Sequence, residues 1–418
     1  MAGGNFGGGN GSSISPYLVE DQADLEAVNN HRDAYFRQTE NIFCSGDFSR
    51  IHSFTGLYDG NRKVIANLNV NMYGTDRTGM FRTMGGTLTR MRLLDSTVNG
   101  RAHVGILAGD LVGSGKITYC YVKGSVTAHG GSTAMGALVT NVGGFAGWSD
   151  PGTHIFRCAA DINVRAIVDN HNKGGFVGHH EGKVEECYSI GSVRGHHDVG
   201  GLIGDAEPGS SIINCYSRSS VYSAGEGSGG LVGDHYPASA GVVNCYSTGR
   251  IQGAEGVGGL CGSRSSYPDT GPVSSSYWDV NTSGQSSDYS AAQPRNTSQM
   301  KQQSNFSGWN FTTIWAINPS INDGYPFLRH VPILADMKST EKINIQPPVY
   351  RSPSLIKSAN PVITFETYAP APSDPLDPNA KPWWDLSWDK DDPPDWIYPD
   401  DPDYEEDGPI FRHEVEGI

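Results

Sequence analysis

Long hydrophobic runs are missing from this sequence. No stretch of about 18 consecutive apolar residues, the length needed to cross a membrane, occurs anywhere in its 418 residues. The N-terminal segment MAGGNFGGGNGSS has neither the basic part nor the apolar part of a secretory signal. We therefore expect no membrane insertion, and a protein that is made and assembled in the cytoplasm.

Basic residues are scarce. The chain has 30 Lys and Arg against 45 Asp and Glu, a net charge of −15. Residues 371–418 contain 15 acidic and 3 basic residues, so this tail carries 3 − 15 = −12 and the remainder carries −15 + 12 = −3. Neither part offers the basic stripe that phosphate backbones require, so nucleic acid is not an expected partner.

The usual sequence motifs of metal sites are also missing. None of the seven cysteines forms a CxxC pair, and the segments HHEGK and HEVEG lack the second histidine of HExxH. We therefore expect no metal, no cofactor and no metallopeptidase activity. Six histidines fall in turns of neighbouring repeats, where solvent-exposed positions are expected and stacking into a metal site is the alternative. These are His171, His179, His180, His196, His197 and His235.

Glycine is abundant, with 54 residues, and it follows a pattern. The phrases VGILAG, VGGFAG, KGGFVG, VGGLIG, SGGLVG and VGGLCG recur between residues 104 and 262 at intervals of 26 to 38 residues. Their apolar centres are Leu107, Phe145, Phe176, Leu202, Leu231 and Leu260. Such a period is typical of repeat architectures, in which each unit buries its apolar face against the next.

The second half of each repeat aligns on one cysteine position. The aligned residues are Cys120, Cys158, Cys187, Cys215 and Cys245, followed by Ser276. Valine or isoleucine stands three residues before, and tyrosine follows in most repeats. Short β-rich runs between Gly, Ser and Asn turns predict a parallel β-helix, whose rungs lie about 4.8 Å apart. The five cysteines would then form a reduced core ladder, because parallel Cβ vectors suit disulfide geometry poorly.

These phrases resemble the GLUG-motif repeat family over about residues 17–330. GGLIG followed by NCYSRSSV, and GGLVG followed by NCYSTGRI, carry the resemblance, and the segment from SYWDV to YPFL is similar to the family's C-terminal cap. Such repeats occur in bacterial surface adhesins, beside the catalytic domains of immunoglobulin-cleaving metallopeptidases, and in bacteriophage proteins. The resemblance implies a right-handed β-solenoid with a binding or display role, and implies no activity.

The expected organisation is all-β: a right-handed parallel β-helix with an N-terminal cap and an extended acidic C-terminal tail. A flexible glycine-rich arm (1–16) precedes the cap and first rungs (17–100), with a strand at 17–19 and a short helix capped by Asp21. Solenoid repeats (101–282), a C-terminal cap (283–330) and a Pro/Asp/Trp-rich tail (331–418) follow. The tail is expected to dock on a partner through four tryptophans, and the alternative is an acidic solubilising tail. These are Trp383, Trp384, Trp388 and Trp396.

Two kinds of surface site are considered. Asp205 and Asp234 follow the glycine phrase in successive repeats, so they would stack as the paired carboxylates of a polysaccharide depolymerase, or accept hydrogen bonds from backbone amides. The binding alternative places recognition in the loops between strands, where Trp148, Tyr236 and Tyr267 would contact cell-surface glycan.

The sequence thus favours a non-enzymatic, structural and adhesive β-solenoid displayed on a particle. The specific hypothesis is a phage virion fibre or tail-tip protein that recognises the host and contacts other virion subunits through its tail. The alternatives are a capsid or tail decoration protein without receptor binding, a polysaccharide depolymerase, and a bacterial surface adhesin.

Overall fold

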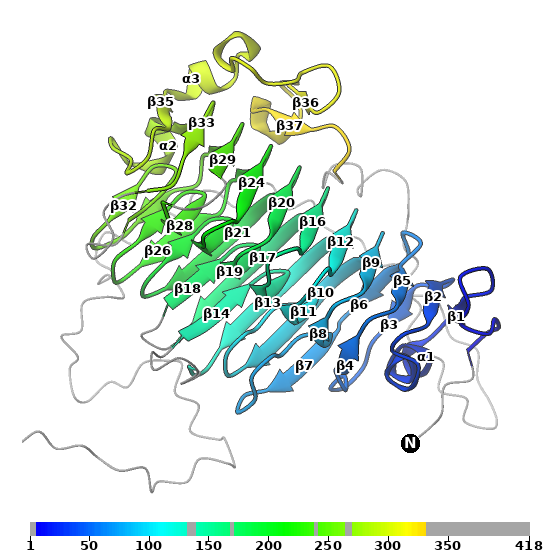
Figure 1. Cartoon of the computed structure of the whole chain (residues 1–418). Coiled ribbons are helices and arrows are strands. Elements are labelled where there is room, and N and C mark those ends of the chain that lie inside the picture. Colours follow the sequence, from blue (N-terminus) through cyan, green and yellow to red (C-terminus); the bar gives the residue numbers. More distant parts are fainter. Residues whose placement is uncertain (1–5, 132–138, 168–170, 238–240, 264–269, 332–418) are drawn as a thin grey trace, which may run out of the picture. The chain divides into compact units, whose positions relative to one another are not determined.

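The computed structural model describes residues 6–331, except 132–138, 168–170, 238–240 and 264–269. The described residues form a β-solenoid in which parallel strands from successive rungs stack into continuous sheets (Figure 1). The expected all-β parallel solenoid is confirmed. Within the described residues, no helix has the length and apolar character needed to cross a membrane.

Each full rung contributes at least one strand to each of four parallel sheets, numbered here in the order in which the chain visits them. Sheet 1 contains β14 (Val139–Gly143), β18 (His171–Gly174), β22 (Val199–Gly200), β27 (Ser228–Gly229) and β32 (Val257–Gly258). Sheet 2 contains β4 (Ile51–Phe54), β8 (Phe81–Met84), β11 (Ala108–Leu111), β15 (Ala146–Ser149), β19 (Val177–His180), β23 (Ile203–Ala206) and β28 (Val232–His235).

Sheets 3 and 4 extend further toward both ends of the solenoid. Sheet 3 contains β1 (Tyr17–Val19), β2 (Tyr35–Gln38), β5 (Leu57–Asp59), β9 (Thr87–Thr89), β12 (Lys116–Thr118), β16 (His154–Phe156), β20 (Lys183–Glu185), β24 (Ser211–Ile213), β29 (Gly241–Val243) and β33 (Val273–Ser274). Sheet 4 contains β3 (Ile42–Phe43), β6 (Val64–Ala66), β7 (Asn69–Met72), β10 (Arg92–Gly100), β13 (Tyr121–Ala128), β17 (Ala159–Ala166), β21 (Tyr188–Gly195), β25 (Tyr216–Ser217), β26 (Ser220–Ser223), β30 (Tyr246–Ser247), β31 (Ile251–Gln252), β34 (Tyr277–Asp279) and β35 (Gln293–Arg295).

The interior of the solenoid is one apolar cluster that runs from Val19 to Ala292. Strand pairing keeps equivalent residues in register, so Ile117 lies beside Ile155 in sheet 3 and Val126 lies beside Val164 in sheet 4. The apolar centres of all six glycine phrases are buried in the same cluster. Stacking therefore buries the apolar side of every rung against its neighbours.

The corner between sheets 1 and 2 requires glycine for steric reasons. A Cβ atom on Gly144 would lie only 2.4 Å from the carbonyl oxygen of Gly175 in the next rung. Consecutive rungs thus approach too closely at this corner for a side chain, which explains why the glycine phrase repeats.

The five aligned cysteines form a buried column, and all seven cysteines of the chain are free. The amide of Cys120 donates to the Sγ atom of Cys158 over 3.3 Å, and the amide of Cys245 donates to the Oγ atom of Ser276 over 3.0 Å. Burial raises the pKa of the Cys187 thiol. The column therefore consists of buried cysteines whose sulfur atoms accept hydrogen bonds from backbone amides.

The chain turns from sheet 3 to sheet 4 through one residue in the left-handed conformation, just before the cysteine position. Few of these residues are of a type that favours a positive φ. They are Arg90, Tyr119, Arg157, Glu186, Asn214, Asn244 and Ser275, with φ between 46° and 54°. The left-handed conformation costs free energy for residues other than glycine. Hydrogen bonds between rungs, such as Tyr119 N–H to Phe156 O (3.0 Å), stabilise the corner against this cost.

The N-terminal end is covered as a solenoid end must be. The side chain of Asp21 accepts a hydrogen bond from the amide of Asp24 and so caps α1 (Gln22–Ala27), as the sequence predicted. Glycine-rich composition indicates a flexible arm before this helix, but residues 6–16 are paired with the first rungs. Gly7 N–H donates to Leu18 O (2.9 Å), and Tyr35 N–H donates to Gly11 O (2.9 Å). Backbone hydrogen bonds need no side chain, so glycine content alone could not reveal this pairing.

The segment after β34 covers a side of the solenoid as well as its end. It contains α2 (Val280–Ser283), β35, α3 (Thr297–Met300), β36 (Trp315–Ala316) and β37 (Phe327–Leu328). The tyrosines that follow the cysteine column point away from the core and stack, with ring centroids 4.8 Å apart for Tyr188 and Tyr216. Trp315 is fully buried over this tyrosine column, with Tyr216 and Tyr246 at 6.1 and 6.0 Å between ring centroids. This second apolar cluster joins the C-terminal segment to several rungs.

The left-handed corners predict an unusual ranking of two substitutions. Tyr119→Gly and Tyr119→Ala remove the same ring, but only glycine adopts φ near 54° without a steric penalty. We expect the Gly variant to be more stable than the Ala variant by about 1 kcal/mol in urea unfolding. A more stable Ala variant would show that this corner is not strained.

The buried C-terminal cluster predicts a large effect at Trp315. Trp315→Ala should lower the free energy of unfolding by about 3–5 kcal/mol, because it leaves a cavity above the tyrosine column. Urea unfolding with near-UV circular dichroism measures this loss. Phe311→Ala in the same segment is the control, since this ring is only partly buried and should cost clearly less. Equal costs would contradict the packing described.

Candidate functional site

Sheet 2 brings five residues that directly follow the glycine phrase into one column. Asp110 pairs with Trp148, Trp148 with His179, His179 with Asp205, and Asp205 with Asp234 on consecutive rungs. Asp205 and Asp234 therefore stack on neighbouring rungs, as their spacing in the sequence predicted. We refer to these five residues as the sheet 2 column.

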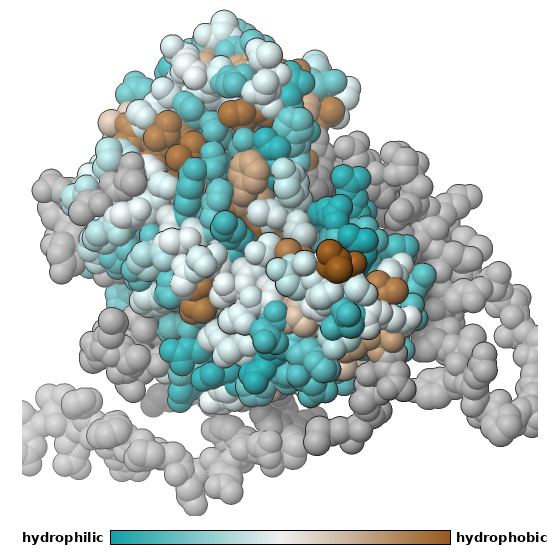
Figure 2. Space-filling model, turned by 45° about the vertical axis from the view of Figure 1, so that its right-hand side comes forward, coloured by the Kyte–Doolittle hydropathy of each residue, from teal (hydrophilic) through white to brown (hydrophobic). Residues whose placement is uncertain are grey.

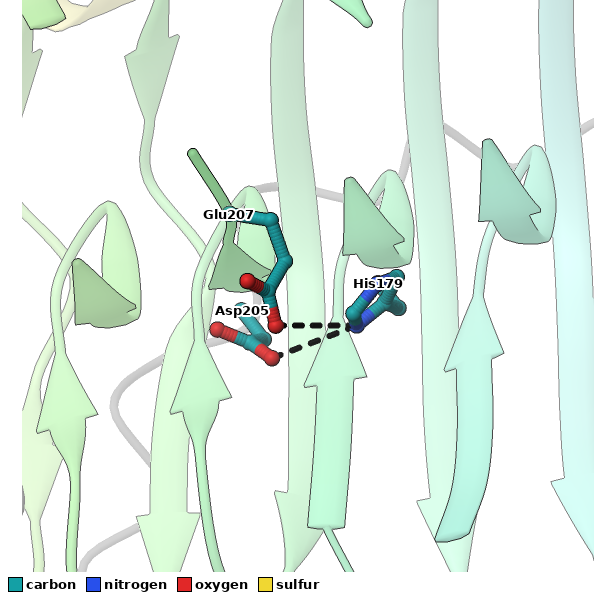
Figure 3. Close-up of side chains that lie close together, drawn as sticks. All are labelled: His179, Asp205 and Glu207. Atoms are coloured by element: carbon teal, nitrogen blue, oxygen red, sulfur yellow. Dashed lines mark hydrogen bonds and ion pairs between the residues drawn. The ribbon is translucent and has the colours of Figure 1, made fainter. Parts of the chain in front are cut away.

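His179 lies among three carboxylates. Its Nδ1 atom is 3.2 Å from Asp205 Oδ2 and 3.9 Å from Glu207 Oε1, and both of these carboxylates point toward the ring (Figure 3). Its Nε2 atom is 3.4 Å from Glu181 Oε1. The His179 side chain is 9% exposed, whereas Glu181 and Glu207 are 25% and 24% exposed, so the cluster opens to solvent only through the two glutamates.

The cluster perturbs its own acid–base behaviour. Burial opposes protonation of His179, but hydrogen bonds to Asp205 and Glu181 outweigh it and raise the pKa of His179 to about 9. Burial and the charge of Asp205 raise the pKa of Glu207 to about 7. Among the described residues, no lysine or arginine forms an ion pair with Asp205 or Glu207. Negative charge therefore exceeds positive charge at this point of the surface.

Two buried acceptor atoms in the cluster have no hydrogen-bond partner. Asp205 is 2% exposed, and its Oδ1 atom has no hydrogen-bond partner. The Oδ1 atom of buried Asn172 also lacks one, while its Nδ2 atom is 3.3 Å from His179 Nδ1. Unpaired buried acceptors cost free energy, so they are uncommon in folded proteins.

The start of the column differs in its charge balance. Arg77 forms an ion pair with Asp110, whose Oδ1 atom also lies 2.7 Å from His103 Nδ1. Trp148 is sandwiched between His103 and His179, with ring centroids 5.6 and 3.8 Å away. Asp110 thus has a permanent cation beside it, and the Asp205–Glu207 pair does not.

The expectation that the repeat histidines lie in exposed turns is wrong for His179, His180 and His235. These residues belong to β19 and β28 and are buried. His180 is accommodated because its Nδ1 atom lies 2.7 Å from Ser149 Oγ on the neighbouring rung. The sequence GHH resembles a turn, but its strand pairing with Asp205 and Ala206 places it within sheet 2.

The other three histidines are partly exposed. His171 lies in β18, pairs with Asp198 at 2.7 Å and stacks on His197 with ring centroids 4.7 Å apart. His196 and His197 occupy the bend between β21 and β22. They lie in sheet 1 and its connection, outside the His179 cluster.

Two of the three proposed glycan-binding aromatics lie among the described residues, and they are apart. Trp148 is half-buried in its ring stack and its Nε1–H donates to Asp150 over 3.0 Å. Tyr236 is half-buried after β28, three rungs away, and its amide donates to Ala206 O. Tyr267 and the four tail tryptophans lie outside the described residues. These are Trp383, Trp384, Trp388 and Trp396.

Sequence analysis identified the row containing His179 and Asp205 but missed Glu181 and Glu207. Each glutamate stands two residues after its row member, in His179-His180-Glu181 and in Asp205-Ala206-Glu207. Both glutamates directly follow the last residue of a paired strand, β19 or β23, so the repeated x+2 spacing was the available signal.

Comparisons with known proteins support the fold and reach little further. No protein-family model matches the chain. Over 242 residues the chain is 28% identical to halomucin of Haloquadratum walsbyi, a match that covers 47% of this chain and 3% of halomucin. A Bacteroides ovatus crystal structure, described as a candidate immunoglobulin A1 protease, is similar with a TM-score of 0.53 and 19% identity. That similarity covers 79% of this chain and 97% of the other, and it shows a shared fold alone.

Burial of His235 predicts a loss of stability in mild acid. Burial lowers the pKa of His235 from 6.5 to about 4, so below pH 6.5 the unfolded chain binds a proton that the folded chain excludes. Its stabilising contribution is complete above pH 6.5 and is lost as the pH falls toward 4, by up to about 3 kcal/mol.

Urea unfolding at pH 7 and pH 4.5 measures this loss. His235→Gln should show a smaller decrease between the two pH values than the unmodified protein. His52→Gln is the matched control, since His52 is exposed, and it should keep the full decrease. The assignment is wrong if His235→Gln loses as much stability as the unmodified protein.

Proposed function

We propose that this chain is a structural and adhesive β-solenoid displayed on the surface of a particle, and specifically a phage virion fibre or tail-tip protein that recognises the host. The observation that carries the proposal is the continuous apolar core from Val19 to Ala292, closed at both ends. Such a core gives a rigid scaffold from which surface segments can be presented.

The connections between successive sheets are the natural recognition segments; Tyr236, for example, lies between β28 and β29, and the connections between sheets 4 and 1 vary in length. β13 ends at Ala128 and β14 begins at Val139, whereas β21 ends at Gly195 and β22 begins at Val199. Strands of fixed register thus alternate with connections of very different length. Variation confined to connections is typical of binding surfaces on rigid scaffolds.

Three further observations support a surface role. The similarity to part of halomucin, a protein named as a mucin, favours display at a surface. The face shown in Figure 2 is mainly hydrophilic with small, separate hydrophobic patches, as suits a scaffold in contact with water. The resemblance to GLUG-motif repeats favours the same role, and the acidic tail with its tryptophans would attach the chain to other virion subunits.

The geometry gives less support to a polysaccharide depolymerase. Glycoside cleavage requires two carboxyl groups that flank the sugar, about 5 Å or more apart. The predicted pair, Asp205 and Asp234, stacks on neighbouring rungs and each residue is 2% exposed, so a sugar has no access between them. A protease role would rest on the Bacteroides ovatus likeness, which concerns the fold. A decoration protein or a bacterial surface adhesin remains compatible with the same scaffold.

Host binding tests the adhesive role. Full-length protein should bind whole host cells or a glycan array, and Tyr236→Ala and Tyr267→Ala should each weaken binding about tenfold, the loss of one aromatic contact. Tyr35→Ala is the control, because Tyr35 is an exposed tyrosine that lies in a strand of sheet 3, and this variant should bind normally.

Other outcomes favour the alternatives. Binding to no host surface would favour a decoration protein, and release of reducing ends from host capsule would establish a depolymerase. Deletion of residues 372–418 should abolish incorporation into particles, and normal incorporation of that variant would refute attachment through the tail.

A further inference from the structure

We propose that His179, Asp205 and Glu207 bind a single divalent transition-metal ion of the Zn²⁺ class. The three donor atoms lie within 4.8 Å of one another, with His179 Nδ1 at 3.2 Å from Asp205 Oδ2 and at 3.9 Å from Glu207 Oε1. Ligand atoms around a tetrahedral Zn²⁺ with bonds of about 2 Å are roughly 3.3 Å apart. Small side-chain adjustments would therefore place all three donors around one ion.

Unpaired buried acceptors point independently to a ligand. The Oδ1 atom of Asp205 has no hydrogen-bond partner, although only 2% of this residue is exposed. Figure 3 shows the Asp205 and Glu207 carboxylates converging on the imidazole ring between β19 and β23. Oδ2 is the oxygen that faces His179, so a cation held by both oxygens of the Asp205 carboxylate would give Oδ1 the partner that it lacks.

Glu181 prepares the imidazole for this role. Its Oε1 atom lies 3.4 Å from His179 Nε2, so it favours the tautomer that carries hydrogen on Nε2 and a lone pair on Nδ1. A carboxylate on the far nitrogen is the usual outer partner of a metal-bound histidine. Glu181 is therefore a positioning residue, and Nδ1 is left to face Asp205 and Glu207.

The neighbouring amide fits a lone pair on Nδ1 as well. Asn172 Nδ2 donates to Asn141 Oδ1 over 2.8 Å, which fixes the orientation of the Asn172 amide, and the same Nδ2 lies 3.3 Å from His179 Nδ1. The single lone pair on Nδ1 can accept from this N–H group or coordinate an ion, so metal binding would replace the contact with Asn172.

The donor set selects the class of ion. One imidazole nitrogen and two carboxylates suit Zn²⁺ and related first-row ions, whereas Ca²⁺ and Mg²⁺ prefer oxygen ligands throughout. Two carboxylate charges also match a divalent ion. Asp110 occupies the equivalent position of the sheet 2 column in an earlier rung. There Arg77 already supplies a cation beside Asp110 and His103, so no metal ion is required.

Zinc titration of the full-length protein tests the proposal. After treatment with a chelator, calorimetric titration with Zn²⁺ should show a site whose Kd rises at least tenfold in Glu207→Gln and in Asp205→Asn. His103→Asn is the matched control: it removes the histidine of the Arg77–Asp110 rung, and asparagine suits its left-handed backbone (φ 53°). This variant should bind Zn²⁺ like the unmodified protein.

Folding of each variant is checked by its urea midpoint, and Glu207→Gln keeps the test valid if Asp205→Asn unfolds, because Glu207 is partly exposed. Loss of one bound Zn²⁺ in the Glu207 and Asp205 variants, with the His103 variant unchanged, supports the site. Absence of Zn²⁺ binding, or equal binding by all variants, overturns it and leaves the cluster as a proton-sharing group. Host-cell binding is measured separately, so failure of the metal site and failure of the adhesive role are distinguishable.

Discussion

Parallel pairing between consecutive rungs is the constraint from which the other features follow. Hydrogen bonds between neighbouring strands align each residue with its equivalent one rung away, as for Ile155 with Val184. A slip by one residue would move the apolar side chains to solvent, so a packed interior fixes the register. Once the register is fixed, every position becomes a column: a thiol column inside, a tyrosine column outside, and a column of mixed charge on sheet 2. The strained corner residues are tolerated because breaking one corner would break two ladders of hydrogen bonds.

Features that repeat could be predicted from the sequence, and features that occur once could not. The cysteine and valine spacing gave the rungs and their core because the same local pattern recurs. The side packing of Trp315 against Asn214 joins residues 101 positions apart and has no counterpart in other rungs. The row of His179 and Asp205 was likewise accessible from alignment. Its chemistry was not, because the burial of GHH depends on strand pairing and the role of Glu207 depends on which strand face meets its neighbour.

The sheet 2 column shows how a repetitive scaffold produces a local site without a special loop. In one rung the charges are balanced, because Arg77 pairs with Asp110 beside His103 and Trp148. Different residues at the same register give the carboxylate-rich cluster around His179. Because the backbone is equivalent at each rung, the difference lies in side chains alone. The scaffold thus separates two tasks: the interior maintains shape, while outward columns and connections are free to acquire chemistry.

The C-terminal segment also limits how this molecule can change in length. Its contacts reach Asn214, Arg218 and Tyr246, so the last rungs are joined to it at fixed separations. Duplication or loss of a repeat within that region would break these matched contacts. Rungs nearer the N-terminus contact mainly their neighbours, apart from links such as the ring contact between Tyr73 and His129 two rungs away. A whole unit there could be gained or lost without altering the C-terminal segment. Copy number is therefore expected to vary between related chains at the early repeats and to stay constant at the late ones.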